Sequence, residues 1–309
     1  MPNTLVLFMF PFPIDRSFVH LGGSMSHGDS HGPSLVTDVS DGFQILGRRK
    51  AQEDALAVRR GSCDGTDALF VVLADGHGEK GADAAQIAVE AGLDLWDDGC
   101  WHGRAFASTA RPFFADVHRR ICMRDKNSGA CLTVVLAIRG GLHVAWAGNV
   151  EAWVGSDPLE RLTVPHEPSV HSREASRVTE AGGGFQPCPP ERCFSGSRPC
   201  YPGHGYVVLA DGSLSLEVSR AVGHPRYEPI VVPDPEIVER VIVPGTRLVV
   251  GSDGAWNVLR PLMGEVSGAV SHLLPDFAAK MVGETVRRRN PADNASMIFV
   301  DLDGFCAIR

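Results

Sequence analysis

The sequence contains no apolar run that approaches the roughly 20 residues of a membrane-spanning helix. We therefore expect no membrane association. Basic residues are also in the minority, with 29 Lys and Arg against 37 Asp and Glu and a formal net charge of -8. Because a protein that binds nucleic acid needs a basic face to neutralise phosphates, this balance argues against a nucleic-acid partner.

Recognisable cysteine motifs are missing as well. The eight cysteines include no Cys-x-x-Cys pair, and several lie inside apolar runs. This usage favours a reducing compartment, so we expect a cytoplasmic or nuclear protein. Four side chains offer zinc-ligating atoms, but their irregular spacing in a segment rich in proline and glycine favours unpaired loop residues. They are Cys188, Cys193, Cys200 and His204.

Two parts of the chain differ in composition and in apolar periodicity. Residues 1–40 are rich in Gly, Ser and His without periodicity, which indicates an N-terminal extension or tail. Their apolar stretch, residues 5–10, is a poor signal peptide because no basic residue precedes it and Pro11 interrupts it. Residues 41–309 have the alternation of short apolar runs and turns of a folded domain, with an irregular, flap-like loop around 185–205.

Apolar periodicity predicts the order of elements in this domain. Strands are expected first, then two helices, then a meander of adjacent antiparallel strands whose tight turn is Gly140-Gly141. A short helix, a strand, a helix and a final strand follow. Strands followed by helices and again by strands indicate an α+β sandwich with antiparallel sheets, and we expect a monomer. The predicted strands are 43–46, 55–58, 69–73, 132–138, 142–146, 152–154, 247–250 and 296–302, and the helices are 82–96, 105–123, 172–181 and 277–289.

Acidic residues stand where the predicted strands are expected to end. They form four short motifs: Glu53-Asp54, Asp75-Gly76, Asp253-Gly254 and Asp293-Asn294. Any one Asp-Gly pair is typical of a β-turn. Apolar strands lead to Asp75 and Asp253, however, and hard divalent cations take oxygen ligands of this kind. The pattern therefore favours carboxylates that converge on a cation site.

Several motifs in a fixed order resemble the type 2C, metal-dependent (PPM) serine/threonine protein phosphatase family. The resemblance extends from about residue 42 to 302. It depends on residues 47–54 (GRRKAQED), 74–78 (ADGHG), 129–133 (GACLT), 252–257 (SDGAWN) and 293–296 (DNAS), with weaker matches at 166–169, 181–183, 212–214 and 219–223. The family's fold implies a four-layer α/β/β/α sandwich with two central antiparallel sheets flanked by helices.

The resemblance also implies roles for individual residues and two Mg²⁺ or Mn²⁺ ions. Asp75 would bridge both cations, with the carbonyl of Gly76 as a further ligand. Asp253 and Asp293 would hold one cation, and Glu53 and Asp54 would act directly or through water. Arg49 would grip the substrate phosphate with two hydrogen bonds, and His77 would be the general acid. The expected substrates are phosphoserine and phosphothreonine proteins.

Two departures from the family pattern bear on activity. The family usually has Gly-Asp-Ser-Arg where this chain has Gly148-Asn149-Val150-Glu151, and Asn149 therefore puts a third cation in doubt. The usual Gly-Asp after the Ser-Arg-Ala stretch is Gly223-His224. These changes leave two alternatives to an active protein phosphatase: a weakly active or inactive pseudophosphatase that acts as a binding or regulatory module, and a two-metal hydrolase of another phosphoester such as a nucleotide.

Overall fold

The structure is a computed structural model that describes residues 39–63, 65–99, 101, 106–187, 205–213 and 215–306. The candidate zinc ligands Cys188, Cys193, Cys200 and His204 and most of the predicted flap-like loop lie outside these ranges, as does nearly all of the predicted N-terminal extension. Within the described ranges, no helix combines the length and apolar character that crossing a membrane requires.

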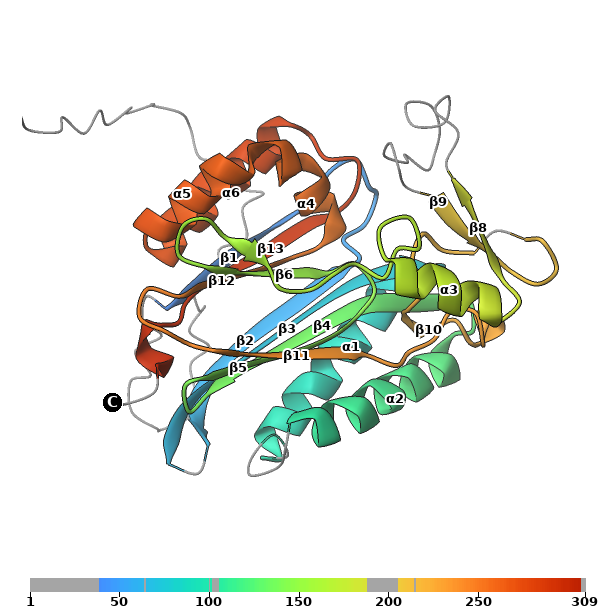
Figure 1. The fold of residues 1–309 in the computed structure, drawn as a ribbon, viewed down its shortest axis with the longest axis horizontal. Helices are drawn as coiled ribbons and strands as arrows, with labels where there is room; N and C mark the ends of the chain where they lie inside the picture. The colour runs from blue at the N-terminus through green and yellow to red at the C-terminus, as the bar shows by residue number, and fades with distance from the viewer. Residues whose placement is uncertain are drawn as a thin grey trace, which may run out of the picture.

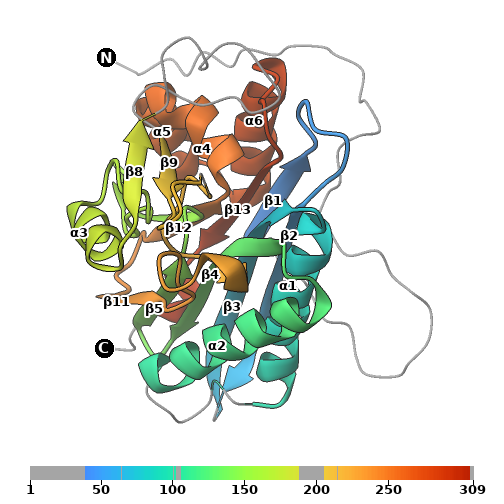
Figure 2. The same ribbon diagram turned by 90° about the vertical axis from the view of Figure 1, so that its right-hand side faces the viewer.

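The chain folds into four layers, which Figure 1 shows from top to bottom and Figure 2 shows after a quarter turn. Each sheet has helices on one face and the other sheet on its opposite face. The outer helices on one side are α4 (Asp253–Leu259), α5 (Met263–His272) and α6 (Pro275–Arg288). Those on the other side are α1 (Gly81–Asp97) and α2 (Phe106–Arg124). The expected four-layer α+β sandwich is confirmed.

The two central sheets are antiparallel. The first has the strand order β1-β13-β12-β6-β7, and the second has the order β11-β5-β4-β3-β2, with β10 paired to β4. The first comprises β1 (Ser40–Ile45), β6 (Glu151–Gly155), β7 (Glu160–Arg161), β12 (Arg247–Gly251) and β13 (Ala295–Asp301). The second comprises β2 (Asp54–Cys63), β3 (Thr66–Gly78), β4 (Ser128–Ile138), β5 (Gly141–Ala147), β10 (Val222–Gly223) and β11 (Glu236–Val241).

Smaller elements surround this framework. Figure 1 shows α3 (Ser172–Glu180) and the hairpin of β8 (Gly184–Pro187) and β9 (Gly205–Val208) at one end of the sandwich, near β10. Single 3-10 turns are η2 (Pro225–Tyr227), η3 (Arg260–Leu262) and η4 (Asp303–Phe305).

The middle strands β3 and β4 are apolar on both faces because each face is covered. In β3, Leu69, Val71 and Leu73 join the core between the sheets, whereas Phe70 and Val72 pack against α1 and α2. Successive side chains of a strand point to opposite faces of the sheet. A strand that is buried on both faces therefore has a continuous run of apolar residues. This is why 69–73 could be predicted from sequence.

The sequence prediction is wrong in several details, and it does not include the strands β7 to β11. The third strand of the expected meander, β6, pairs with β12 in the other sheet, because the chain crosses between sheets at Gly148-Asn149. The tight turn consists of Arg139 and Gly140, which both have positive φ, and Gly141 already begins β5. The helices α4 and α5 were not predicted, because Gly254, Gly264 and Gly268 weaken their helical signal.

Candidate active site

The four predicted acidic motifs lie at one end of the sandwich. Asp54 begins β2 and is paired directly with Asp75 near the end of β3. In the other sheet, Asp253 follows the end of β12, and Asp293 precedes the start of β13. Because both strand pairs are antiparallel, the end of one strand adjoins the start of its partner. The fold thereby places carboxylates of both sheets close together.

Hydrogen bonds hold the Asp54 side chain between the two sheets. It is only 6% exposed, and its Oδ2 accepts hydrogen bonds from the hydroxyls of Ser252 at 2.9 Å and Ser296 at 2.6 Å. The Ser252 hydroxyl also accepts a hydrogen bond from the Ser296 backbone N–H at 3.0 Å. The other carboxylate oxygen of Asp54, Oδ1, is buried and has no hydrogen-bond partner among the described residues.

Asp253 has a neutral partner. The Asn149 side-chain amide donates to Asp253 Oδ2 at 2.9 Å and to Glu167 Oε1 at 3.3 Å. The amide therefore lies between two carboxylates. The amide nitrogen donates hydrogen bonds to both carboxylates. The amide carries no negative charge, so it does not replace a carboxylate as a cation ligand.

Arg49 is a positively charged residue at the solvent-exposed side of these aspartates. Its guanidinium forms an ion pair with Asp293 and lies 3.9 Å from Glu53 Oε2. The backbone N–H of Glu53 donates to the Asn294 side chain at 2.8 Å, which ties the segment of Arg49 to the start of β13. Arg49 is 43% exposed, so its charge faces the solvent side of the site.

Gly76 lies where a side chain would not fit. A Cβ there would lie 2.0 Å from the Gly81 carbonyl oxygen and 2.7 Å from the Glu53 carbonyl oxygen. The Gly76 backbone N–H donates to that Glu53 carbonyl at 3.0 Å. Glycine thus allows the end of β3 to pack tightly against the start of β2 and α1.

The electrostatics of the buried carboxylates are unfavourable when only protein groups are counted. Burial raises the pKa of Asp75 and Asp253 well above the usual range, and neighbouring aspartates raise it further. The pKa of Asp54 rises to about 7, again chiefly because of burial, although its two serine partners oppose the shift. A buried group of like charges is costly unless an opposite charge joins it.

These residues fit a divalent cation. Several carboxylates here raise one another's pKa, and Asp54 Oδ1 is a buried carboxylate oxygen without a hydrogen-bond donor among the described residues. Hard cations such as Mg²⁺ and Mn²⁺ take oxygen ligands of this kind. The roles of the individual residues as ligands stay predictions.

Comparison with known proteins decides the family. A family model described as "Protein phosphatase 2C" matches residues 43–263. The chain belongs to this family. The family consists of serine/threonine protein phosphatases, which agrees with the class expected from the sequence motifs.

Curated relatives carry the same family name. "Probable protein phosphatase 2C 30" of Arabidopsis thaliana is 28% identical, with 89% of this chain and 70% of that protein covered. "Probable protein phosphatase 2C member 13, mitochondrial" of Oryza sativa subsp. japonica is 27% identical, with 82% and 65% covered. The chain thus spans about two thirds of the length of these relatives.

Solved structures support the protein phosphatase 2C fold. A Caenorhabditis elegans sex determining protein has a TM-score of 0.65 at 23% identity, over 85% of this chain and 65% of that one. The 2C phosphatase of Toxoplasma gondii has a TM-score of 0.65 at 16% identity, over 85% and 94%. The catalytic domain of PstP, solved with two manganese ions, has a TM-score of 0.58 at 17% identity, over 85% and 96%. At these identities the likeness concerns the fold.

His77 lies next to the acidic residues at the end of β3. Its Nδ1 is 2.8 Å from Nε2 of His224, and its Nε2 is 3.9 Å from Sγ of Cys131. Burial lowers the pKa of His77 to about 3 and that of His224 to about 4. A protonated ring at this position therefore depends on its hydrogen-bond partner and on the charge of a bound anion.

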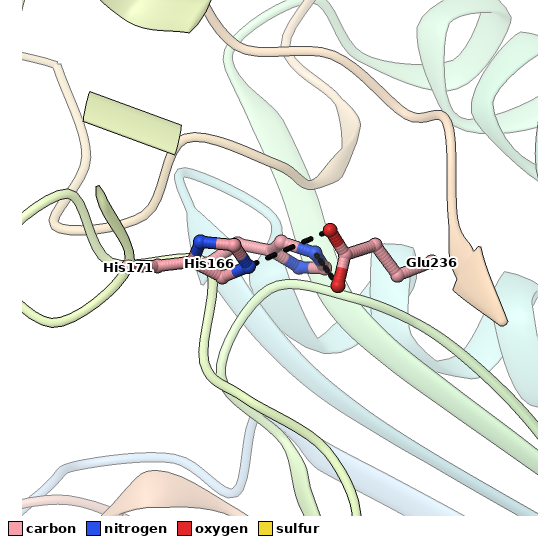
Figure 3. Close-up of side chains that lie close together, drawn as sticks. All are labelled: His166, His171 and Glu236. Atoms are coloured by element: carbon pink, nitrogen blue, oxygen red, sulfur yellow. Dashed lines mark ion pairs between the residues drawn. The ribbon is translucent and has the colours of Figure 1, made fainter. Parts of the chain in front are cut away.

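The structure reveals a second polar group that sequence reasoning missed (Figure 3). His166 and His171 precede α3, and Glu236 begins β11. The Glu236 carboxylate lies 3.8 Å from Nε2 of His166 and 3.5 Å from Nε2 of His171. All three could offer a ligand atom within 4.8 Å of one another.

Two observations argue against a metal ion among these three residues. Nδ1 of His166 accepts a hydrogen bond from the Gly148 N–H at 3.0 Å, so the proton of the neutral ring is on Nε2 and that nitrogen has no free lone pair. The Arg220 guanidinium also lies 3.6 Å from Glu236. We interpret the group as structural: it fixes the turn at Gly148 that carries Asn149.

The sequence motifs include the residues that support the acidic site, but sequence reasoning gave them no role. Ser252, Ser296 and Asn294 orient Asp54 and Glu53. The available signal was their position, because each is a small polar residue within or directly beside a predicted acidic motif, or in the strand that follows it. Glu167 was noted within a weaker motif, but its distance from Asn149 could be known only from the fold.

Proposed function

We propose that this chain is a metal-dependent protein phosphatase that hydrolyses phosphoserine and phosphothreonine. The observation that carries the proposal is the convergence of Asp54, Asp75, Asp253 and Asp293. The burial of the first three and the repulsion among the four carboxylates call for divalent cations. The family and the manganese-containing relative PstP support the same chemistry.

Each group in the site has a chemical task under this proposal. Asp75, the carbonyl of Gly76, Asp253 and Asp293 would hold two Mg²⁺ or Mn²⁺ ions, with Glu53 and Asp54 binding directly or through water. The bound cations supply an activated water and neutralise charge on the phosphoryl oxygens.

The basic side chains act on the substrate. Arg49 would turn from Asp293 to the phosphate once cations neutralise the aspartate, and its planar guanidinium can donate two parallel hydrogen bonds to phosphate oxygens. His77 would donate a proton to the leaving serine or threonine oxygen, because an alkoxide is a poor leaving group.

One observation favours a second candidate, a non-catalytic binding or regulatory module. Asn149 occupies the place of the family aspartate and bonds both Asp253 and Glu167, so a third cation lacks its carboxylate. A chain with a full two-cation site but impaired turnover would still bind a phosphoprotein at Arg49. The expected monomeric state and the cytoplasmic or nuclear location stay predictions.

Turnover of a phosphothreonine peptide separates these candidates. Purified protein should hydrolyse the peptide in the presence of Mn²⁺ or Mg²⁺ and should stop doing so when EDTA is added. The Asp253→Asn variant should show no turnover even with Mn²⁺ or Mg²⁺. Nucleotides serve as competing substrates, and faster hydrolysis of a nucleotide than of the peptide would favour the alternative phosphoesterase. Peptide binding without turnover in saturating Mn²⁺ would favour the binding module. Turnover that persists in EDTA would contradict the proposed mechanism.

A further inference from the structure

Exposed apolar side chains gather on one helix, α6. Eight large hydrophobic residues are exposed among those that the structure describes, and three of them belong to α6 or to its N-cap. Leu274, Phe277 and Met281 are 52%, 55% and 46% exposed. Because a helix turns by about 100° per residue, their spacing of three and four residues places them on one side of α6. We call these three residues the apolar stripe.

A small cavity lies beside the apolar stripe, between α5 and α6. Its volume is about 100 Å³, and its walls include Met281 and Val282 of α6, Val266 of α5 and Leu262. Pockets for small-molecule ligands usually measure about 300 Å³ or more. The cavity therefore suits one apolar side chain of a polypeptide better than a separate small ligand.

The charged residues around the apolar stripe pair with one another. Nζ of Lys280 lies 5.6 Å from the centroid of the Phe277 ring and 4.0 Å from a carboxylate oxygen of Asp276. Glu284 forms ion pairs with two arginines of the last turns of α6. Charges on α6 are thus matched locally, and the exposed feature that remains is apolar. An uncharged, apolar segment is the occupant that this surface fits.

The described chain begins beside this helix. β1 lies beneath α6, and Phe43 of β1 belongs to the same core cluster as Ala278 and Val282 (Figure 1). The carbonyl of Val39 accepts a hydrogen bond from the N–H of Asp301, at the end of β13. The short loop after α6 leads to the start of β13, so α6 and β13 run in opposite directions. The N-terminal turn of α6, which carries the apolar stripe, therefore lies toward the end of β1 where the preceding residues enter.

Those preceding residues contain one continuous apolar run. Residues 5–10 (LVLFMF), outside the described ranges, are all apolar, and 28 residues separate them from Val39. A chain of that length can span up to roughly 90 Å, several times the length of α6 at about 1.5 Å per residue. Because the run is joined to the same chain, its local concentration can reach roughly the millimolar range, which favours binding within the chain over binding to a second molecule.

We propose that residues 5–10 bind the apolar stripe of their own chain, with one apolar side chain in the cavity between α5 and α6. Contact between the two would remove apolar surface of both from water, which is the main favourable contribution to such association. The surface belongs to the outer helical layer and includes none of the acidic residues of the candidate active site. The proposal therefore does not depend on the proposed phosphatase function.

A photo-crosslinker on the helix tests this contact in the full chain. p-Benzoylphenylalanine is placed at position 277, where it replaces another aromatic side chain. In a control protein it is placed at position 241, where Val241 is exposed on the edge strand β11. After irradiation, mass spectrometry identifies the crosslinked peptides, and gel electrophoresis separates crosslinks within one chain from those between two chains. Melting temperatures check that each protein folds.

We expect a crosslink from position 277 to residues 5–10 within one chain, and none to these residues from position 241. The double substitution Leu7→Asp and Phe8→Asp should lower the yield of that crosslink by more than about tenfold, because two apolar side chains are lost from the contact. A crosslink that joins two chains would show that the stripe binds a second copy and would overturn the proposal. Crosslinks only to other residues, no crosslink at all, or an unchanged yield in the double variant would also overturn it.

Discussion

Two groups of carboxylates in this molecule have opposite electrostatics. We call Asp54, Asp75, Asp253 and Asp293 the acidic cluster, and Glu174, Arg177, Ser219, Arg220, Glu236 and His166 the paired network. In the acidic cluster the pKa values of the deepest carboxyls are raised. In the paired network, the pKa values of Glu174 and Glu236 are both lowered to about 2.

The difference comes from the partners that the protein supplies. Glu174, only 1% exposed, accepts hydrogen bonds from Arg220 at 2.6 Å, Arg177 at 3.0 Å and Ser219 at 2.6 Å. Burial raises its pKa, but these donors outweigh burial. Asp75 and Asp253 are partly buried, and among the described residues neither has an arginine or lysine as an ion-pair partner, since Arg49 pairs with Asp293 at the exposed side. A complete charge network is structural, whereas an incomplete one calls for a ligand.

The largest effect is expected from Asp75→Asn. The substitution removes a charge from the centre of the acidic cluster, so cation binding and turnover should fall, by about a thousandfold in kcat/KM if the loss matches that of a central electrostatic contact. Steady-state kinetics in Mn²⁺ on a phosphothreonine peptide measures the effect. In EDTA the same variant should melt at an equal or higher temperature than the wild type, because repulsion is relieved. A marked drop in that temperature would mean that Asp75 is structural.

The paired network should respond in the opposite way. Glu174→Gln removes the buried carboxylate that accepts hydrogen bonds from Arg177 and Arg220, so the free energy of unfolding should fall by about 3 kcal/mol. Glu284→Gln on α6 is the matched control, since Glu284 also pairs with two arginines but on the surface, where we expect about 0.5 kcal/mol. Urea denaturation compares the two. Equal losses would erase the distinction between buried and exposed pairs.

Acid should weaken the paired network selectively. Because the folded pKa values of Glu174 and Glu236 are about 2 and the ordinary value is 4.5, their contribution is present above about pH 4.5 and is lost as the pH falls toward 2. Denaturation curves at a series of pH values should therefore show a shallower acid dependence in Glu174→Gln than in wild type. An unchanged slope would contradict the assigned charge state.

Arg49→Lys tests the exposed edge of the acidic cluster. Lysine keeps the positive charge but cannot donate two parallel hydrogen bonds, so KM for a phosphothreonine peptide should rise by about tenfold with a smaller change in kcat. Arg59→Lys, on the exposed side of β2, is the control and should leave KM unchanged. An unaltered KM in Arg49→Lys would place phosphate binding elsewhere.

The smallest effect is expected from Asn149→Asp. The new carboxylate would face Asp253 and Glu167, to which the amide now donates. It should allow a third Mn²⁺ to bind weakly and should raise turnover by less than about tenfold. Mn²⁺ titrations followed by electron paramagnetic resonance count the bound ions. A variant that binds no more Mn²⁺ than wild type would show that the amide does not limit the site.

The acidic cluster could be predicted from the sequence because its members are adjacent to strand ends and small residues. Asp75 follows a strand that is apolar on both faces, and Asp253 follows β12, so local patterns locate both. The paired network could not be predicted in this way. Glu174, Arg220 and Glu236 come from a helix, a loop and an edge strand, and only the fold brings them together.

The crossing between the two sheets shows another limit of local patterns. β5 and β6 look alike as short apolar runs, yet β5 pairs with β4 and β6 with β12. The sheet that β6 joins depends first on the turn at Gly148, where φ is +110° and a Cβ would clash with Cys131. It also depends on the hydrogen bonds between Gly148 and His166. These contacts are distant in sequence, so the local pattern does not contain them.

Calorimetric titration of the cation-free protein with Mn²⁺ tests the central claim most directly. The acidic cluster should bind two ions per chain, and the stoichiometry should fall in Asp253→Asn, whereas Glu174→Gln should still bind two. No binding by the wild-type chain, or the same stoichiometry in Asp253→Asn, would contradict the account.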